Sequence, residues 1–249
     1  MSAGTRCVPL EARCFNLKAD SALLWNIDRA STRAVLFDLD GTLLDTAPDM
    51  AGALNELRRE QHLAPLPYPD IRPVVSHGAT ALVRLGFGDV ATTRFEELRK
   101  RFLAIYSTRL AAETRLFAGL NEALSRLESS GVEWGVVTNK PGWLTDPLLQ
   151  QLNLSGRARV VVSGDTLEQR KPHPAPLLHA AKKLGVQPFE CVYIGDAERD
   201  VLAARAAGMK VWVALFGYIP SGERPREWAA DGWLETPEQL ARLLMLLSD

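Results

Sequence analysis

The chain has 249 residues, 47% of them hydrophobic and 24% charged, which is ordinary for a globular protein long enough to bury a core. Its 29 basic and 30 acidic residues nearly cancel, so no broad surface for nucleic acid or an anionic membrane is expected. No apolar run approaches the roughly 18 residues of a membrane span. The three scattered cysteines match no disulfide framework or metal spacing, which favours a reducing cytoplasm.

Residues 1–32 form no readable element, because charged residues interrupt every apolar cluster. The longest apolar run there, Ala22 to Trp25, is shorter than the roughly 7–15 residues of a signal peptide's central region. We treat this segment as an N-terminal extension and assign it no function.

The run from Ala34 to Phe37 reads as a buried strand, since four consecutive apolar residues suit a sheet covered on both faces. It leads directly into Asp38, Asp40 and Gly41. A surface turn could also carry two acids and a glycine. In open α/β sheets, however, ligands bind at the ends of such strands, and the glycine permits a tight turn or a close backbone approach.

A helical block is expected over roughly 47–115, with no convincing strand. Its first helix starts with Pro48 in the first turn and Thr46 or Asp45 as the cap. Ser76-His77-Gly78 reads as a turn that opens a further helix, and apolar residues recur at three or four positions from Thr92 to Glu113.

Strands and helices alternate after this block. The expected strands are 134–138, 160–163, 192–194 and 211–215, the last being the final strand; the expected helices are 121–130, 141–152, 174–184, 199–207 and 237–247. Such alternation predicts an α/β fold, a Rossmann-like parallel sheet with helices on both faces and right-handed crossovers.

Three more polar clusters follow expected strands. Thr138 and Asn139 precede a helix and could bind a phosphate there, or simply cap the helix. Lys171 lies in a proline-rich stretch and could offset negative charge, although an exposed lysine is the commoner reading. Asp196 and Asp200 would repel Asp38 unless a hard cation lay among them; Asp200, like Glu198, could otherwise favour a helix start.

These clusters, in this order, resemble the four motifs of the haloacid dehalogenase superfamily in its phosphatase form. The first is Asp38-Leu39-Asp40-Gly41-Thr42, followed by Thr138, by Lys171-Pro172 and by Gly195-Asp196 with Asp200. The resemblance covers about residues 33–249. It implies a catalytic core from 33–46 and 116–249, with 47–115 as a small inserted helical cap.

The resemblance also implies roles for these residues. Asp38 would be the nucleophile that forms an aspartyl-phosphate, and Asp40 the general acid/base. Lys171 and Thr138, with Asn139 nearby, would bind the phosphoryl group. Mg²⁺ would be held by Asp38, the backbone carbonyl of Asp40, and Asp196, with Asp200 in or beside the coordination shell.

The substrate is expected to be a small phosphorylated metabolite, chosen by the cap. Ser76, His77 and Gly78 are the cap candidates, with Arg84 weaker; a histidine such as His77 is more often a surface or capping residue than a substrate contact. Three stretches, 74–79, 195–200 and 216–220 with Trp228 and Asp231-Gly232, resemble N-acetylmuramic acid 6-phosphate phosphatases of cell-wall recycling, among the phosphoglycolate-phosphatase-like members. The alternatives are phosphoglycolate as substrate, a phosphomutase, or a non-catalytic module that binds phosphorylated ligands.

Overall fold

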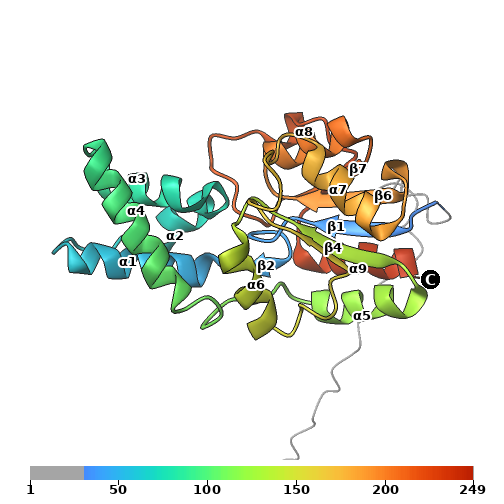
Figure 1. The fold of residues 1–249 in the computed structure, drawn as a ribbon, viewed down its shortest axis with the longest axis horizontal. Coiled ribbons are helices and arrows are strands. Elements are labelled where there is room, and N and C mark those ends of the chain that lie inside the picture. The colour runs from blue at the N-terminus through green and yellow to red at the C-terminus, as the bar shows by residue number, and fades with distance from the viewer. Residues whose placement is uncertain (1–30, 249) are drawn as a thin grey trace, which may run out of the picture.

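The computed structural model describes residues 31–248, so the extension expected over 1–32 lies almost wholly outside the described residues. The described chain has two parts (Figure 1): a sheet flanked by helices, and a group of helices to one side of it. None of the helices within residues 31–248 combines the length and the hydrophobicity that a membrane span requires.

The main sheet has six parallel strands in the order β5-β4-β1-β6-β7-β8. They are β1 (Ala34–Phe37), β4 (Glu133–Val137), β5 (Val160–Val162), β6 (Cys191–Gly195), β7 (Lys210–Ala214) and β8 (Gly232–Leu234). The parallel α/β prediction is confirmed. The expectation that the strand near 211–215 is the last one is wrong, because Gly232–Leu234 adds an edge strand beside β7.

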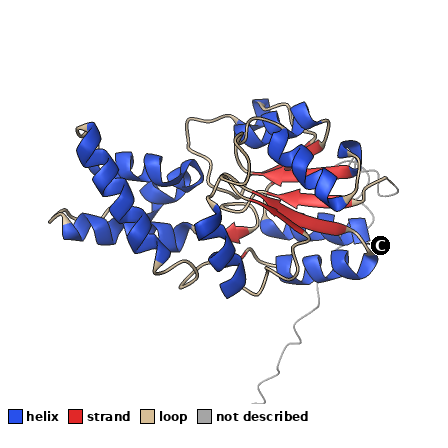
Figure 2. Cartoon of the chain, viewed as in Figure 1, coloured by secondary structure: helices blue, strands red, loops and turns tan. Residues whose placement is uncertain are grey.

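Helices cover both faces of this sheet (Figure 2). On one face lie α5 (Leu120–Ser130), α6 (Gly142–Gln151) and α9 (Pro237–Ser248), whose apolar residues belong to one buried cluster. On the other lie α7 (Ala175–Leu184) and α8 (Glu198–Ala207), which share a second cluster. Burial on both faces explains why β1, with all four residues buried, reads as a continuous apolar run.

A block of helices interrupts the chain between two short strands, β2 (Leu44–Asp45) and β3 (Arg115–Leu116), which pair antiparallel. The block contains α1 (Ala47–Glu60), α2 (Tyr68–Ile71), the 3-10 helix η1 (Arg72–His77), α3 (Gly78–Phe87) and α4 (Thr92–Ser107). It packs around its own apolar side chains, among them Leu54, Leu82 and Phe102. Two short 3-10 helices, η2 (Pro188–Glu190) and η3 (Pro225–Glu227), lie elsewhere in the chain.

The start of α1 differs from the prediction in its capping. Pro48 does lie in the first turn, and Thr46 occupies the cap position, but its side chain caps nothing. The Thr46 hydroxyl donates to Asp40 Oδ1 instead, at 2.7 Å. The N–H of Ala47 is satisfied by the hydroxyl of Tyr218, which in turn donates to Asp45. Thr46 is thus the N-cap residue, as one of the two predicted candidates, but its side chain makes no capping hydrogen bond because its hydroxyl donates to Asp40.

Candidate active site

The polar clusters meet at one edge of the sheet because β1 lies between β4 and β6. Asp38 and Asp40 follow β1, Thr138 follows β4, and Asp196 follows β6. In a parallel sheet the carboxyl ends of neighbouring strands share an edge, where ligands bind. Strand order thus brings Asp38 together with Thr138, 100 positions further along the chain, and with Asp196, 158 positions further along.

Asp38 is a buried carboxylate held beside a cation. Its side chain is 4% exposed, and Oδ1 lies 2.9 Å from the Lys171 ammonium. Burial alone would raise the pKa of Asp38, but Lys171 and the guanidinium of Arg199 together hold it below its usual value. Asp38 is therefore ionised at neutral pH, as a nucleophile must be.

Lys171 is fully buried and makes four polar contacts. Besides Asp38, its ammonium lies 2.8 Å from Asp200 Oδ1 and donates to the Val137 carbonyl at 2.8 Å and to the Tyr193 hydroxyl at 2.7 Å. Its burial rules out the exposed-lysine reading. One ammonium serving two carboxylates fixes the geometry at the centre of the site.

The main chain of Lys171 is held by Asn139. The amide of Asn139 donates to the Lys171 carbonyl at 2.9 Å and accepts from the Lys171 N–H at 3.1 Å. The Thr138 side chain, almost fully buried, accepts from the N–H of Lys140 at 3.2 Å. Asn139 thus acts on the position of Lys171, which is a task that its place beside Thr138 in the sequence does not reveal.

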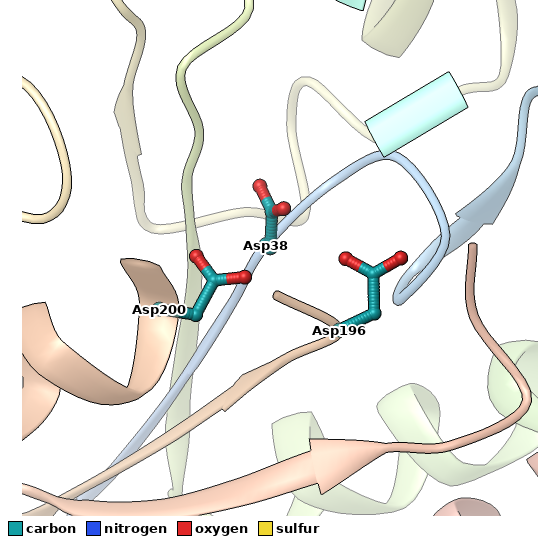
Figure 3. Close-up of side chains that lie close together, drawn as sticks. All are labelled: Asp38, Asp196 and Asp200. Carbon is teal, nitrogen blue, oxygen red and sulfur yellow. The ribbon is translucent and has the colours of Figure 1, made fainter. Parts of the chain in front are cut away.

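Three buried carboxylates gather in this site (Figure 3). Asp38, Asp196 and Asp200 each offer an oxygen atom within 4.8 Å of the others. One oxygen of Asp196, Oδ1, is buried and accepts no hydrogen bond from residues 31–248. Burial and the carboxylates of Asp38 and Asp200 raise the pKa of Asp196 to about 8. A hard divalent cation would relieve both the repulsion and the unsatisfied oxygen, so the residues fit a Mg²⁺ site.

Asp200 serves a structural purpose as well. Its Oδ2 accepts from the N–H of Ala197 at 3.1 Å, at the start of α8, while Oδ1 faces Lys171. Burial and the neighbouring Asp38 raise the pKa of Asp200, although Lys171 opposes this. Asp200 therefore both accepts a hydrogen bond at the start of α8 and belongs to the acidic cluster. Glu198 is exposed to solvent at the first residue of α8.

Gly41 makes room for this cluster. Its φ is +84°, and a side chain here would collide with Asp196 Oδ2 and the ring of Tyr218. The same Asp196 oxygen accepts from the main-chain N–H of Tyr218 at 2.8 Å. The glycine thus provides both the turn and the close approach that the sequence suggested.

Asp40 faces a different set of partners. Its Oδ1 accepts from the Thr46 hydroxyl at 2.7 Å and from the ammonium of Lys140 at 3.0 Å. The side chain of Asp40 is 16% exposed, against 4% for Asp38. Asp38 and Asp40 therefore differ both in the exposure of their side chains and in the groups that contact them.

The helical block reaches the site through Ser76. Its hydroxyl donates to Asp196 Oδ2 at 2.6 Å and lies 3.4 Å from the Asp40 carbonyl, while its own carbonyl accepts from Arg199 at 2.8 Å. Arg72 of η1 adds a second link by donating to the carbonyls of Phe216 and Gly217.

The other candidates from the block lie further out. The His77 side chain is 38% exposed, and its Nε2 is 3.3 Å from Glu223. Gly78, with φ +73°, opens α3 as expected. The guanidinium of Arg84 is exposed and lies over the ring of Phe95 within the block.

Sequence reasoning missed several residues of the site. The residues that it missed contact the site residues or each other: Lys140 and Tyr106, Tyr193 beside Lys171, Arg199 beside Ser76, and Tyr218 beside Asp196. A signal existed for Lys140, which follows Thr138-Asn139 directly, and for Arg199 and Tyr218, which lie in two of the stretches that carry the resemblance, 195–200 and 216–220. Tyr106 is on a helix whose other residues gave an ordinary amphipathic pattern, so nothing in the sequence separated its hydroxyl from the core.

Comparison with known proteins gives a consistent set of relatives. The family model described as haloacid dehalogenase-like hydrolase matches residues 35–214. The chain is 48% identical to a phosphoglycolate phosphatase of Xanthomonas campestris, over 84% of this chain and 94% of the relative. It is 40% identical to an N-acetylmuramic acid 6-phosphate phosphatase of Pseudomonas aeruginosa, over 87% and 96%.

Among solved structures, one from Haemophilus somnus, described as a predicted phosphoglycolate phosphatase, has a similar fold. The TM-score is 0.76 at 25% sequence identity, covering 86% of this chain and 98% of that one. The family match thus runs from β1 to β7 and includes the helical block.

Proposed function

The chain belongs to the haloacid dehalogenase-like hydrolases and is a phosphoric monoester hydrolase, and from this premise we propose that Asp38 cleaves its substrate through an aspartyl-phosphate. The observation that carries the proposal is the buried Asp38 carboxylate, whose Oδ1 lies 2.9 Å from the Lys171 ammonium. Attack by Asp38 on phosphorus forms a bond to the carboxylate oxygen and releases the alkoxide. Splitting the hydrolysis in this way replaces one difficult step by two easier ones.

A carboxylate can approach a phosphate dianion only where positive charge offsets the repulsion. Lys171 supplies one such charge, and Thr138 with the following backbone would bind the phosphoryl oxygens. Asp38, the carbonyl of Asp40, and Asp196 would hold Mg²⁺, with Asp200 beside them, consistent with the buried unsatisfied oxygen of Asp196. When bound, the ion would neutralise negative charge on the phosphoryl group.

Asp40 is proposed as the general acid and base. Thr46 and Lys140 fix its Oδ1, and the side chain is the more exposed of the two acids. It would give a proton to the departing alkoxide and then take one from the water that hydrolyses the aspartyl-phosphate. The block at 47–115 would act as a cap that excludes water during the first step, moving about the links near Thr46 and Leu116.

Two substrates are supported by relatives. N-acetylmuramic acid 6-phosphate is favoured by the stretches at 74–79, 195–200 and 216–220, and a 40% identical relative bears that name. Phosphoglycolate is favoured by the higher identity, 48%, to a phosphoglycolate phosphatase. The proposed cap residues that contribute to this choice are His77, Gly78 and Ser76, which donates a hydrogen bond to Asp196 of the acidic cluster.

The proposed location is a reducing cytoplasm, which the buried free thiol of Cys191 fits.

The test is phosphate release by the purified chain from p-nitrophenyl phosphate and from a panel of esters that includes both candidates, ranked by kcat/KM. Release should require Mg²⁺ and stop on chelation. Asp38→Asn, which keeps the shape of the side chain, should abolish turnover without unfolding the protein. An active Asp38→Asn variant would refute the nucleophile assignment. A well-folded protein that releases no phosphate would favour the non-catalytic alternative.

A further inference from the structure

Lys140 is a second buried ammonium, next to the proposed acid rather than the nucleophile. Its side chain is 5% exposed, and its Nζ donates to Asp40 Oδ1 at 3.0 Å and to the Tyr106 hydroxyl at 2.9 Å. Tyr106 comes from α4 of the helical block, and Lys140 from the loop after β4. The pair therefore bridges the two parts of the molecule beside Asp40, the proposed general acid.

Two hydrogen-bond donors in this pair have no acceptor among residues 31–248. An ammonium has three N–H groups, and Lys140 uses two of them. The Tyr106 hydroxyl accepts from Lys140, and its own proton has no acceptor in the described part of the chain. Both side chains are buried, and buried donors normally have partners. Two unused donors on atoms 2.9 Å apart are the arrangement that an anionic group would satisfy.

We propose that Lys140 and Tyr106 bind a carboxylate on the leaving group, so that the enzyme prefers phosphate esters of short 2-hydroxy acids. This inference rests on the proposed function, since it assumes that Asp40 faces the ester oxygen. It adds a specificity-determining pair to the phosphate chemistry and commits to one substrate class.

Distance decides which carboxylates can be bound. An oxygen that takes a proton from Asp40 must come within about 2.6–3.2 Å of that carboxyl group. Lys140 Nζ lies 3.0 Å from Asp40 Oδ1. A carboxylate one carbon away from the ester oxygen, as in phosphoglycolate, can then reach the ammonium. In N-acetylmuramic acid 6-phosphate the carboxylate is carried by the substituent on carbon 3 of the sugar, across the ring from the phosphate.

The experiment compares phosphoglycolate with its neutral amide, 2-phosphooxyacetamide, which has nearly the same shape. The readout is the ratio of kcat/KM for the acid to that for the amide, with saturating Mg²⁺ and the full chain. Wild-type protein should prefer the acid by about 10- to 100-fold, the range expected of a hydrogen-bonded charge. Lys140→Met should lower the rate on both substrates, because Asp40 loses a partner, and should bring the ratio close to one.

Two further variants complete the design. Tyr106→Phe removes one donor and retains the ring that packs near Phe102, so the ratio should fall several-fold in a protein that remains folded. Lys183→Met removes the charge of an exposed lysine of α7 and should leave the ratio at the wild-type value. If Lys140→Met does not fold, the ratio measured for Tyr106→Phe decides the question.

Three results would overturn the inference. One is a wild-type enzyme that does not distinguish the acid from the amide. Another is an unchanged ratio in both Lys140→Met and Tyr106→Phe, which would mean that Lys140 acts only by positioning Asp40. The third is a higher kcat/KM for N-acetylmuramic acid 6-phosphate than for phosphoglycolate. In each case release of phosphate from p-nitrophenyl phosphate would show that the proposed function itself stands.

Discussion

Lys171→Met is the substitution that most directly tests how the centre of the site is held. Methionine has nearly the length of lysine and removes the ammonium while largely preserving the packing. The variant leaves Asp38 and Asp200, at 2.9 Å and 2.8 Å from the lost Nζ, buried without their shared cation. It also removes the ammonium that donates to the Tyr193 hydroxyl and to the Val137 carbonyl, although this carbonyl still accepts from the Tyr193 hydroxyl at 2.9 Å.

Removing one partner of a buried ion pair destabilises a protein by about 3–5 kcal/mol, because the other charge is left without compensation. For a chain of this size that corresponds to a fall in Tm of roughly 6–20 °C. The two carboxylates do not each add this amount, since protonation of one relieves the repulsion between them. We therefore expect a loss within this range and no larger.

The loss should depend on pH in a definite direction. In the wild type Lys171 helps to hold the pKa of Asp38 below its usual value, so the ionised carboxylate stabilises the fold above about pH 4. Without the ammonium, burial raises that pKa. A carboxyl group whose pKa is higher in the folded than in the unfolded state favours the folded protein at low pH, and the free energy of unfolding falls as the pH rises. The difference in Tm from the wild type should therefore grow between pH 5 and pH 8.

The assay is thermal unfolding in the presence of a chelator at pH 5, 6.5 and 8, with Lys183→Met as the matched control. An exposed lysine far from such features should change stability by no more than about 0.5 kcal/mol. A Tm for Lys171→Met within 2 °C of the control, or a deficit that shrinks as the pH rises, would show that Lys171 does not hold the carboxylates.

Two other predictions concern the metal and the cap. Because the pKa of Asp196 is raised to about 8, metal-free protein should lose stability as the pH rises toward 8, at up to about 1.4 kcal/mol per pH unit. Mg²⁺ must displace that proton, so it should raise Tm more at pH 8 than at pH 6; equal shifts would contradict this. His77→Ala should change the ratio of kcat/KM between two natural esters by about two- to fivefold, the size of one half-exposed polar contact. Its rate on p-nitrophenyl phosphate should change less, and an unaltered ranking of esters would count against a role for His77.

The parts of the fold that the sequence predicted are those with long or strongly apolar patterns. Strands such as β1 and β6, buried on both faces, gave continuous apolar runs: β1 has the predicted bounds, and β6 extends one residue beyond the predicted 192–194 at each end. The edge strand Gly232–Leu234 escaped notice because three residues that begin with glycine show no pattern. The two-residue strands β2 and β3 are shorter still, and only their pairing defines them.

In the site, sequence order placed the acids and Lys171 but gave no information about partners distant in the chain. That Asn139 holds the main chain of Lys171 depends on two loops 32 residues apart. That Lys140 is buried depends on α4 lying against the loop after β4, since Tyr106 contributes the hydroxyl that it contacts. A lysine in a loop after a strand is usually exposed, so burial of this one could be known only from the packing of the helical block.

The position of β1 in the sheet has a consequence for how the protein is made. Ala34 pairs with Glu133 on one side and with Cys191 on the other, more than 150 residues further along the chain. Pairing over such separations closes long loops and is slow compared with the local contacts that form helices. During synthesis the helices between β2 and β3 can therefore form early, whereas the sheet edge that carries Asp38 forms only after β4 and β6 have been made. A truncated chain that ends before Cys191 carries Asp38, the proposed nucleophile, but neither Asp196 nor Asp200, so it lacks two of the three carboxylates of the proposed metal site.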